Sequence, residues 1–229
     1  MKTKMKTWIA TIGFLPMLFA TAAHGADRLC IDRFDSPDNK TELGGWWYVF
    51  DDARMGGNST ISPAPDHFTP GKSDDAQGCA AHLTGKSGNK LGWDFFGMGF
   101  TIMPDSGCPV SSAVDLSQYS TLEFKIRGEV SAGRLSVVIP YTGETCEGKV
   151  PETLTAWADY QAGVTAEVGE EWTTVRLDLR KDFSQPAWTK PSHKVSIEQV
   201  LLRAHVIQWN FSSSDGDTVD IWIDDIYLY

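Results

Sequence analysis

Apolar and polar residues alternate in short runs along the chain, and the clearest run closes it at 220–229. Alternation with period two predicts a strand with one buried face. The phase slips by one residue at Asp224-Asp225, which predicts a β-bulge. A second slip occurs at Asp32-Arg33, within the run 29–35. Two slipped, acid-bearing strands at the chain ends are expected to pair with each other.

Similar runs fill the rest of the chain, separated by clusters of Gly, Pro, Asn, Asp and Ser. Loops are expected at 141–164 and 184–194, and no amphipathic helix is evident. Many short strands without intervening helices predict an all-β fold, an antiparallel two-sheet β-sandwich of the jelly-roll type. The expected strands lie at 46–50, 60–61, 79–84, 91–100, 121–128, 134–140, 172–179 and 200–209.

The first 25 residues have the pattern of a secretory signal peptide. Three lysines precede an apolar stretch at 8–20, and Ala23-His24-Gly25 offers small residues for cleavage. No later stretch has the ~20 apolar residues of a membrane-spanning helix. We therefore expect a secreted or periplasmic protein whose residues 26–229 form a single domain.

Removal of that segment takes away three lysines and no acidic residue, so the formal net charge changes from −10 to −13. Such an acidic chain is unsuited to nucleic acid or to an anionic membrane surface. The charge fits a neutral ligand or a cation, or it simply keeps the protein soluble. We expect a monomer.

All four cysteines lie in the exported part of the chain. An even number of cysteines in an oxidising compartment predicts two disulfides, and the spacings match no zinc site. Three pairings are possible, of which Cys30–Cys79 with Cys108–Cys146 is preferred.

Several motifs, taken in chain order, resemble those of galactose-binding-like jelly-roll modules. The opening Cys30–Asp35 is followed by Gly44–Tyr48, and the other motifs are Gly92-Trp93, Gly97–Phe100, Val114–Phe124, Glu171–Val175 and Asp220–Ile226. The chain is most similar to family 11 carbohydrate-binding modules and to complex I intermediate-associated protein 30 domains. The resemblance implies a concave face that binds a glycan, to which a late strand and the 141–160 loop contribute.

Sugars bind proteins through flat aromatic rings and planar polar side chains. Trp46 and Trp47 are adjacent in a predicted strand, so at most one of them is a core residue. Arg203 and His205 share one face of the predicted late strand, and the resemblance places that face in the glycan site. The candidate carbohydrate-binding residues are Trp46, Trp47, Tyr48, Trp93, Tyr141, Trp157, Tyr160, Arg203 and His205. Each tryptophan could instead pack in the core, and the late-strand face could simply be solvated.

A structural calcium ion is a further expectation, because hard cations bind several carboxylate and carbonyl oxygens. The resemblance brings together the segments that carry Asp35, Asp52 and Asp225. The alternative is a set of solvated surface acids.

The sequence favours a non-catalytic protein that recognises a β-glucan-like polysaccharide. Two other functions stay open. One is an activity in polysaccharide breakdown, for which Glu144, Glu147 and Glu152 could supply an acid pair. The other is a protein-interaction or assembly domain, as in the complex I relatives, which would present an exposed apolar patch.

Overall fold

The computed structural model describes residues 28–73, 78–144, 154–214 and 216–229. Twelve strands and one short α-helix lie within these ranges. The strands are β1 (Leu29–Asp32), β2 (Trp47–Asp51), β3 (Thr60–Ser62), β4 (Gly71–Lys72), β5 (Cys79–Lys86), β6 (Asp94–Thr101), β7 (Thr121–Val130), β8 (Arg134–Ile139), β9 (Tyr160–Gly163), β10 (Thr173–Asp178), β11 (Val206–Ser213) and β12 (Thr218–Leu228), and the helix is α1 (Ile197–Leu201).

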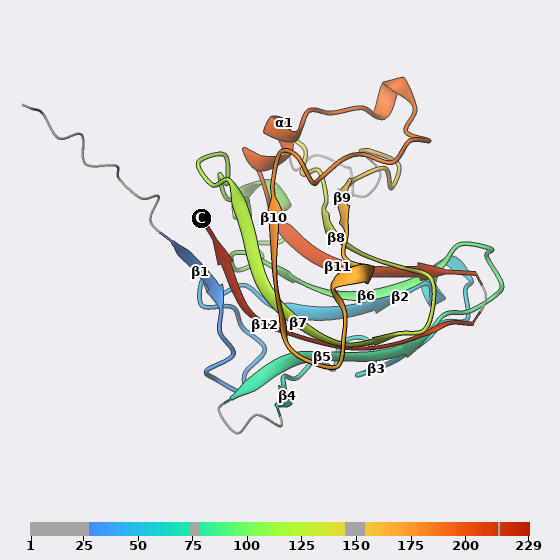
Figure 1. Ribbon diagram of the computed structural model, residues 1–229. Coiled ribbons are helices and arrows are strands. Elements are labelled where there is room, and N and C mark those ends of the chain that lie inside the picture. The colour runs from blue at the N-terminus through green and yellow to red at the C-terminus, as the bar shows by residue number, and fades with distance from the viewer. Residues whose placement is uncertain (1–27, 74–77, 145–153, 215) are drawn as a thin grey trace, which may run out of the picture.

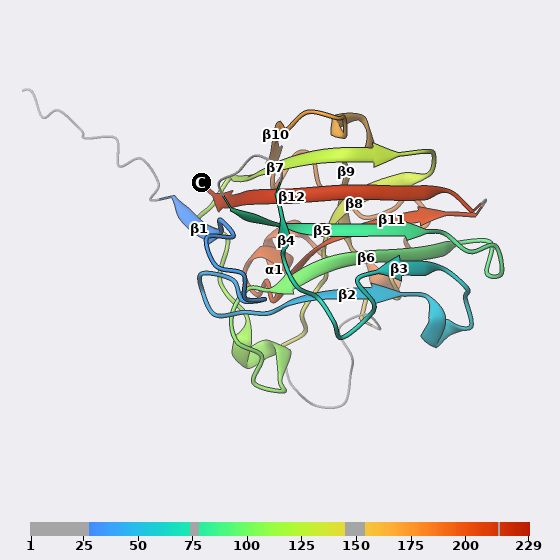
Figure 2. The same cartoon turned by 90° about the horizontal axis from the view of Figure 1, so that it is seen from below.

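The strands form two antiparallel sheets that face each other (Figures 1 and 2). The first has the order β10-β7-β12-β5-β3, with β1 also paired to β12 and β4 to β5. The second has the order β2-β6-β11-β8-β9. This arrangement confirms the antiparallel two-sheet sandwich.

The core lies between the two sheets and is built from alternate residues of each strand. In β12, Val219, Ile221 and Ile223 are buried, whereas Asp220 and Trp222 between them face outward. The buried Trp209 ring of β11 meets the Phe124 ring of β7 edge-on, with centroids 5.1 Å apart. The side chains of the opposite phase therefore lie on the outer faces of the two sheets.

The two chain ends pair as expected. Leu29 lies opposite Leu228, and the ladder shifts register between Cys30 and Asp32. On the other side of β12, the pairing with β7 shifts between Asp224 and Tyr227, and Asp225 has a φ of +51°. The bulges that the phase slips predicted are thus confirmed.

Two of the expected local structures are wrong. The predicted strand 200–209 begins only at β11, because residues 197–201 form α1, at one end of the sandwich in Figure 1. A capping box between Ser196 and Gln199 fixes the start of this helix. The predicted loop at 141–164 contains β9, which pairs with β8.

Cys30 and Cys79 are both free thiols, so the expected Cys30–Cys79 bond is wrong. The two residues lie on strands that pair with different parts of β12, and each is only partly buried. Cys146 and the expected signal peptide at 1–25 lie outside the described residues, so the second bond and export stay predictions. None of the helices in the described ranges is long and apolar enough to span a bilayer.

Candidate functional site

A pocket of about 520 Å³ lies on the outer face of the five-stranded sheet; we call it the sheet-face pocket. All five strands of that sheet contribute to it, together with flanking segments. Its lining comprises Tyr48, Phe50, Asp51, Arg54, Met55, Trp93, Phe95, Arg134, Val138, Trp157, Asp159, Gln161, Trp188, Gln208, Asn210 and Ser212.

The alternation of side chains in the strands determines which residues reach the sheet-face pocket. In β11, Ile207, Trp209 and Phe211 are fully buried in the core. Gln208 and Asn210 point the opposite way, as period two requires, and line the pocket. The pocket floor along β11 is therefore polar.

An aromatic row covers one side of the sheet-face pocket. The rings of Tyr48 and Phe50 are 6.0 Å apart, those of Phe50 and Phe95 are 6.3 Å apart, and those of Phe95 and Trp93 are 6.1 Å apart. The last two rings are almost parallel, at 9°. Gly97 makes the row possible, since a Cβ there would lie 2.6 Å from Cζ of Phe50.

Two further tryptophans line the sheet-face pocket, from segments that flank β9 and β10. Trp157 and Trp188 are 54% and 64% exposed. Trp157 has a φ of +68°, an unusual conformation for a bulky residue. The turn is held by Asp159, which is 8% exposed and accepts a 2.6 Å hydrogen bond from the Thr155 hydroxyl. Strained residues of this kind concentrate at binding sites.

The polar floor offers hydrogen-bonding groups to a ligand. The Tyr48 hydroxyl donates to Oε1 of Gln208 at 3.3 Å, which leaves the amide N–H groups of Gln208 available. Asn210 also lines the pocket, although its Oδ1 is itself buried and has no hydrogen-bond partner within the described part of the chain. Two arginines and two aspartates balance the charge of the lining.

Three of the nine residues predicted from the sequence lie in the sheet-face pocket: Tyr48, Trp93 and Trp157. Trp46 and Trp47 do point apart, as expected. Trp46 is 43% exposed but lies outside the pocket lining, with the Lys40 ammonium 4.7 Å from its ring centroid. Trp47 is 3% exposed and packs in the core, which contradicts its prediction as a sugar platform.

Tyr141 and Tyr160 are not brought to the sheet-face pocket. Both rings pack against the hydrophobic core. The Tyr160 hydroxyl donates a 3.0 Å bond to the carbonyl of Val195, and burial raises the pKa of this phenol. Their segment reaches the pocket through Trp157 and Asp159 instead, and β9 contributes Gln161.

Arg203 and His205 do not share a strand face, because both precede β11. Arg203 forms an ion pair with Glu144 at 3.1 Å. His205 is 6% exposed, and burial lowers its pKa, which the charge of Asp105 partly offsets. Neither residue lines the sheet-face pocket. Both have the same parity along the chain as the buried Ile207 and Trp209, so neither belongs to the outward-facing set of β11.

Sequence reasoning missed most of the polar floor and part of the aromatic row. The missed residues include Phe50, Phe95, Arg134, Gln161, Trp188, Gln208 and Asn210. Correct phasing of β11 against buried Trp209 would have found Gln208 and Asn210. No local signal identifies Trp188, because a loop brings it to the pocket.

The three aspartates proposed as calcium ligands are not brought together. Asp35 pairs with Arg33, and Asp225 pairs with Lys125 at 2.7 Å. Asp52 is fully buried, and its carboxylate accepts bonds from the protein itself. No cluster of three His, Cys, Asp or Glu residues suited to a metal occurs in the described ranges. This ligand set does not fit a calcium site.

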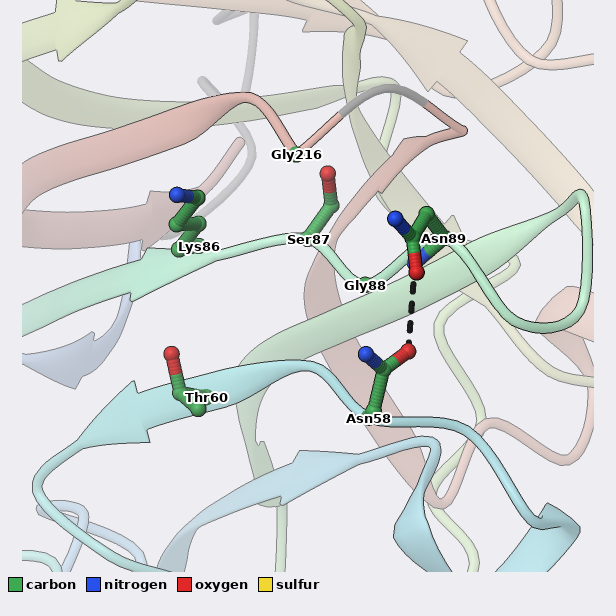
Figure 3. Close-up of a pocket in the computed structure, with 7 residues that line it drawn as sticks. All are labelled: Asn58, Thr60, Lys86, Ser87, Gly88, Asn89 and Gly216. Carbon is green, nitrogen blue, oxygen red and sulfur yellow. Dashed lines mark hydrogen bonds between the residues drawn. The ribbon is translucent and has the colours of Figure 1, made fainter.

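A second, smaller pocket lies beside β3 and the end of β5 (Figure 3); we call it the end pocket. It has a volume of about 330 Å³ and a polar lining. Oδ1 of Asn58 accepts a 3.1 Å bond from the backbone N–H of Asn89, drawn as a dashed line in Figure 3. Asn89 belongs to the same loop as Trp93, so this loop lies between the two pockets.

The solved structures that share this fold include three carbohydrate-binding modules. A family 11 carbohydrate-binding module of the cellulosomal cellulase Lic26A-Cel5E of Clostridium thermocellum is 13% identical, with a TM-score of 0.53 over 88% of this chain and 93% of that chain. A family 11 module from the same organism, in complex with a β-1,3-1,4-mixed-linked tetrasaccharide, is 14% identical, with a TM-score of 0.54 over 88% and 94%. A family 30 module is 19% identical, with a TM-score of 0.51 over 88% and 86%.

No curated protein sequence matches the chain. The structural likeness nevertheless confirms the predicted resemblance to family 11 modules. The family model "Carbohydrate binding domain 30" matches residues 41–229, which is most of the chain and includes every residue that lines the sheet-face pocket. The chain therefore belongs to the family of carbohydrate binding domain 30.

Proposed function

We propose that this protein is an exported, non-catalytic module that binds a β-glucan-like polysaccharide in the sheet-face pocket. One observation carries the proposal. Trp93, Trp157 and Trp188 are the three most exposed large hydrophobic side chains of the described residues, and all of them line this pocket. Exposed aromatic rings around a concave polar site are typical of ligand recognition.

The binding mechanism combines two kinds of contact. The tryptophan rings cover the apolar C–H faces of successive sugar units and remove apolar surface from water. The amides of Gln208, Asn210 and Gln161 then bond the hydroxyl groups, which fixes the orientation of the chain. Stacking supplies most of the affinity, and the polar floor supplies the specificity.

Two features support a neutral glucan over a charged polymer. The pocket lining has no net formal charge, because Arg54 and Arg134 are matched by Asp51 and Asp159. A related family 11 module binds a β-1,3-1,4-mixed-linked tetrasaccharide. Both support a chain of uncharged β-linked sugars as the partner.

The two rival functions receive less support. A protein-interaction domain is expected to present an exposed apolar patch, whereas Gln208 and Asn210 make the floor of this pocket polar along β11. For an enzyme, the candidate acid Glu144 is engaged by Arg203, and Glu147 and Glu152 lie outside the described residues. A calcium ion held by residues other than Asp35, Asp52 and Asp225 is a separate proposal, and repeating the binding titration below in the presence of EDTA tests it.

Calorimetric titration of the protein with a soluble mixed-linkage β-1,3-1,4-glucan tests the proposal, with mannan and a polyuronate as comparison polymers. Trp157→Ala and Trp188→Ala should each weaken binding at least tenfold, about 1.4 kcal/mol. Trp46→Ala is the matched control, since that ring is exposed but lies outside the pocket. Absence of binding to every polysaccharide by the folded protein would refute the proposed function.

A further inference from the structure

The loop that precedes β6 and ends at Trp93 is held through its backbone. Each N–H group from residue 87 to residue 92 donates a hydrogen bond of 2.8–3.2 Å. Five of these six bonds go to side-chain oxygens, and only that of Ser87 goes to a backbone carbonyl. Surface loops normally leave many such groups to water. This loop is instead fixed by side chains behind it.

Asp94 accepts three of these five bonds to side-chain oxygens. Its carboxylate accepts bonds from the N–H groups of Lys90, Leu91 and Gly92 at 3.1–3.2 Å. Asp94 is fully buried and is absent from the lining of the sheet-face pocket, although its neighbours Trp93 and Phe95 both line it. A buried carboxylate is tolerated only when it is well hydrogen-bonded, and these three donors meet that requirement.

Asp52 and Ser59 hold the same loop from its other end. Asp52, also fully buried, accepts bonds from the Ser59 hydroxyl at 2.6 Å and from the N–H of Phe95 at 3.2 Å. The Ser59 hydroxyl oxygen in turn accepts the N–H of Gly88 at 2.9 Å. Side-chain bonds thus connect the loop to the strand that carries Phe95.

The loop is closely packed against the side chains behind it at Gly88. A Cβ at Gly88 would lie 2.4 Å from Oδ1 of Asp94 and 2.4 Å from Oδ1 of Asn58. Asn58 accepts the N–H of Asn89 on the side of the end pocket (Figure 3). The loop is therefore enclosed by acceptors on one side and by the aromatic row on the other.

We propose that Asp94 is a positioning residue that sets the Trp93 ring parallel to Phe95, so that a glycan meets a preformed platform. The inference rests on the proposed function. A long side chain that must be ordered upon binding lowers affinity, and a support that orders it beforehand avoids that cost. Asp94 would thus control affinity without touching the ligand.

The test compares Asp94→Asn, Trp93→Ala and the double variant in calorimetric titration with the mixed-linkage glucan. Asparagine keeps the size of the side chain, but it removes the charge and one of the acceptor oxygens. We expect Asp94→Asn to weaken binding about fivefold to tenfold. In the Trp93→Ala background it should cause no further loss, because it acts through that ring. Unchanged affinity, or losses that multiply fully, would overturn the proposal.

A second readout needs no ligand. In protein labelled with 5-fluorotryptophan, the ¹⁹F resonance missing from Trp93→Ala identifies Trp93. That resonance should broaden or split in Asp94→Asn, whereas the buried Trp209 resonance should stay unchanged. An unaltered Trp93 resonance would overturn the proposal even if the protein bound no glucan, so this failure differs from that of the proposed function.

Asn58→Ala is the variant to measure if Asp94→Asn does not fold. It removes only the bond to the N–H of Asn89 and disturbs no buried carboxylate. We expect a smaller change of the same kind in affinity and in the Trp93 resonance. Asp115→Asn is the control, because that exposed aspartate holds a comparable turn through the N–H of Ser117 far from the loop. Equal effects of the two variants would contradict the proposal.

Discussion

The indole N–H of Trp47 donates a 2.7 Å hydrogen bond to Oδ2 of Asp32, and this bond joins the two sheets of the sandwich. Both residues are buried, at 3% and 4% exposure. Oδ1 of the same carboxylate accepts the N–H of Phe34 at 2.8 Å. Burial nevertheless dominates and raises the pKa of Asp32 to about 6, while these hydrogen bonds act in the opposite direction.

The raised pKa of Asp32 predicts that its contribution to stability falls as the pH rises. Between its unfolded pKa of 3.8 and its folded pKa of about 6, the folded state keeps a proton that the unfolded state has lost. The free energy of unfolding of the wild type, relative to Asp32→Asn, should therefore fall by about 2 kcal/mol from pH 4 to pH 7. Urea denaturation across this range measures it, with exposed Asp66→Asn as control. A difference that is constant with pH would contradict the prediction.

Trp47 is predicted to act in stability and not in binding. Trp47→Phe removes the bond to Asp32 and leaves part of the indole volume empty, which should cost about 2–4 kcal/mol of unfolding free energy. The affinity for the mixed-linkage glucan should not change, because the ring packs in the core. Denaturation and calorimetry of the same samples separate the two effects. Weaker binding at unchanged stability would restore Trp47 as a platform.

The sequence predicted the sandwich well, because the pattern that specifies each strand lies within a few neighbouring residues. Period-two runs specify strands, and the phase slips at Asp32-Arg33 and Asp224-Asp225 mark real bulges in the pairing of β1 and β12. The adjacent Trp46 and Trp47 had to point to opposite faces, and they do. Alternation alone could not say which of the two was buried, since both are large and aromatic.

The candidate site was predicted only in part, because it depends on which residues of β11 face outward and on segments that are distant in sequence. The burial of Ile207 and Trp209 sets the phase of β11, so its outward face carries Gln208 and Asn210. Arg203 and His205 lie before the strand, in the segment that follows the short helix α1. Its capping box, Ser196 with Gln199, was the available signal for that helix. Trp188 reaches the pocket through a loop, and no periodicity describes such a loop.

Gly97 should be required for the aromatic row. A Cβ at this position would lie 2.2 Å from the carbonyl oxygen of Trp209 and 2.6 Å from Cζ of Phe50. Gly97→Ala should therefore lower the unfolding free energy by about 1–3 kcal/mol and weaken glucan binding by displacing Phe50. Gly169→Ala is the control, because nothing lies within 4 Å of its Cβ position. Equal stability of the two variants would show that the clash is relieved without cost.

The polar floor should determine which sugars the protein accepts. Gln208→Ala and Asn210→Ala each remove an amide that faces the sheet-face pocket, and each should weaken binding of the mixed-linkage glucan by about 0.5–1.5 kcal/mol. Tyr48→Phe should have a smaller effect, since it removes only the hydroxyl that donates to Oε1 of Gln208. Calorimetry measures the losses, with exposed Gln118→Ala as the amide control.

The same variants separate specificity from affinity. If stacking on the tryptophans supplies most of the affinity, the floor variants Gln208→Ala and Asn210→Ala should lose much of the preference for mixed-linkage glucan. The ratio of the affinity for this glucan to the affinity for mannan should then move toward one. Trp188→Ala should instead weaken both polymers by a similar factor, because a ring covers any pyranose face. Floor variants that leave this ratio unchanged would show that Gln208 and Asn210 do not read the hydroxyl pattern, and would assign specificity to the shape of the aromatic row.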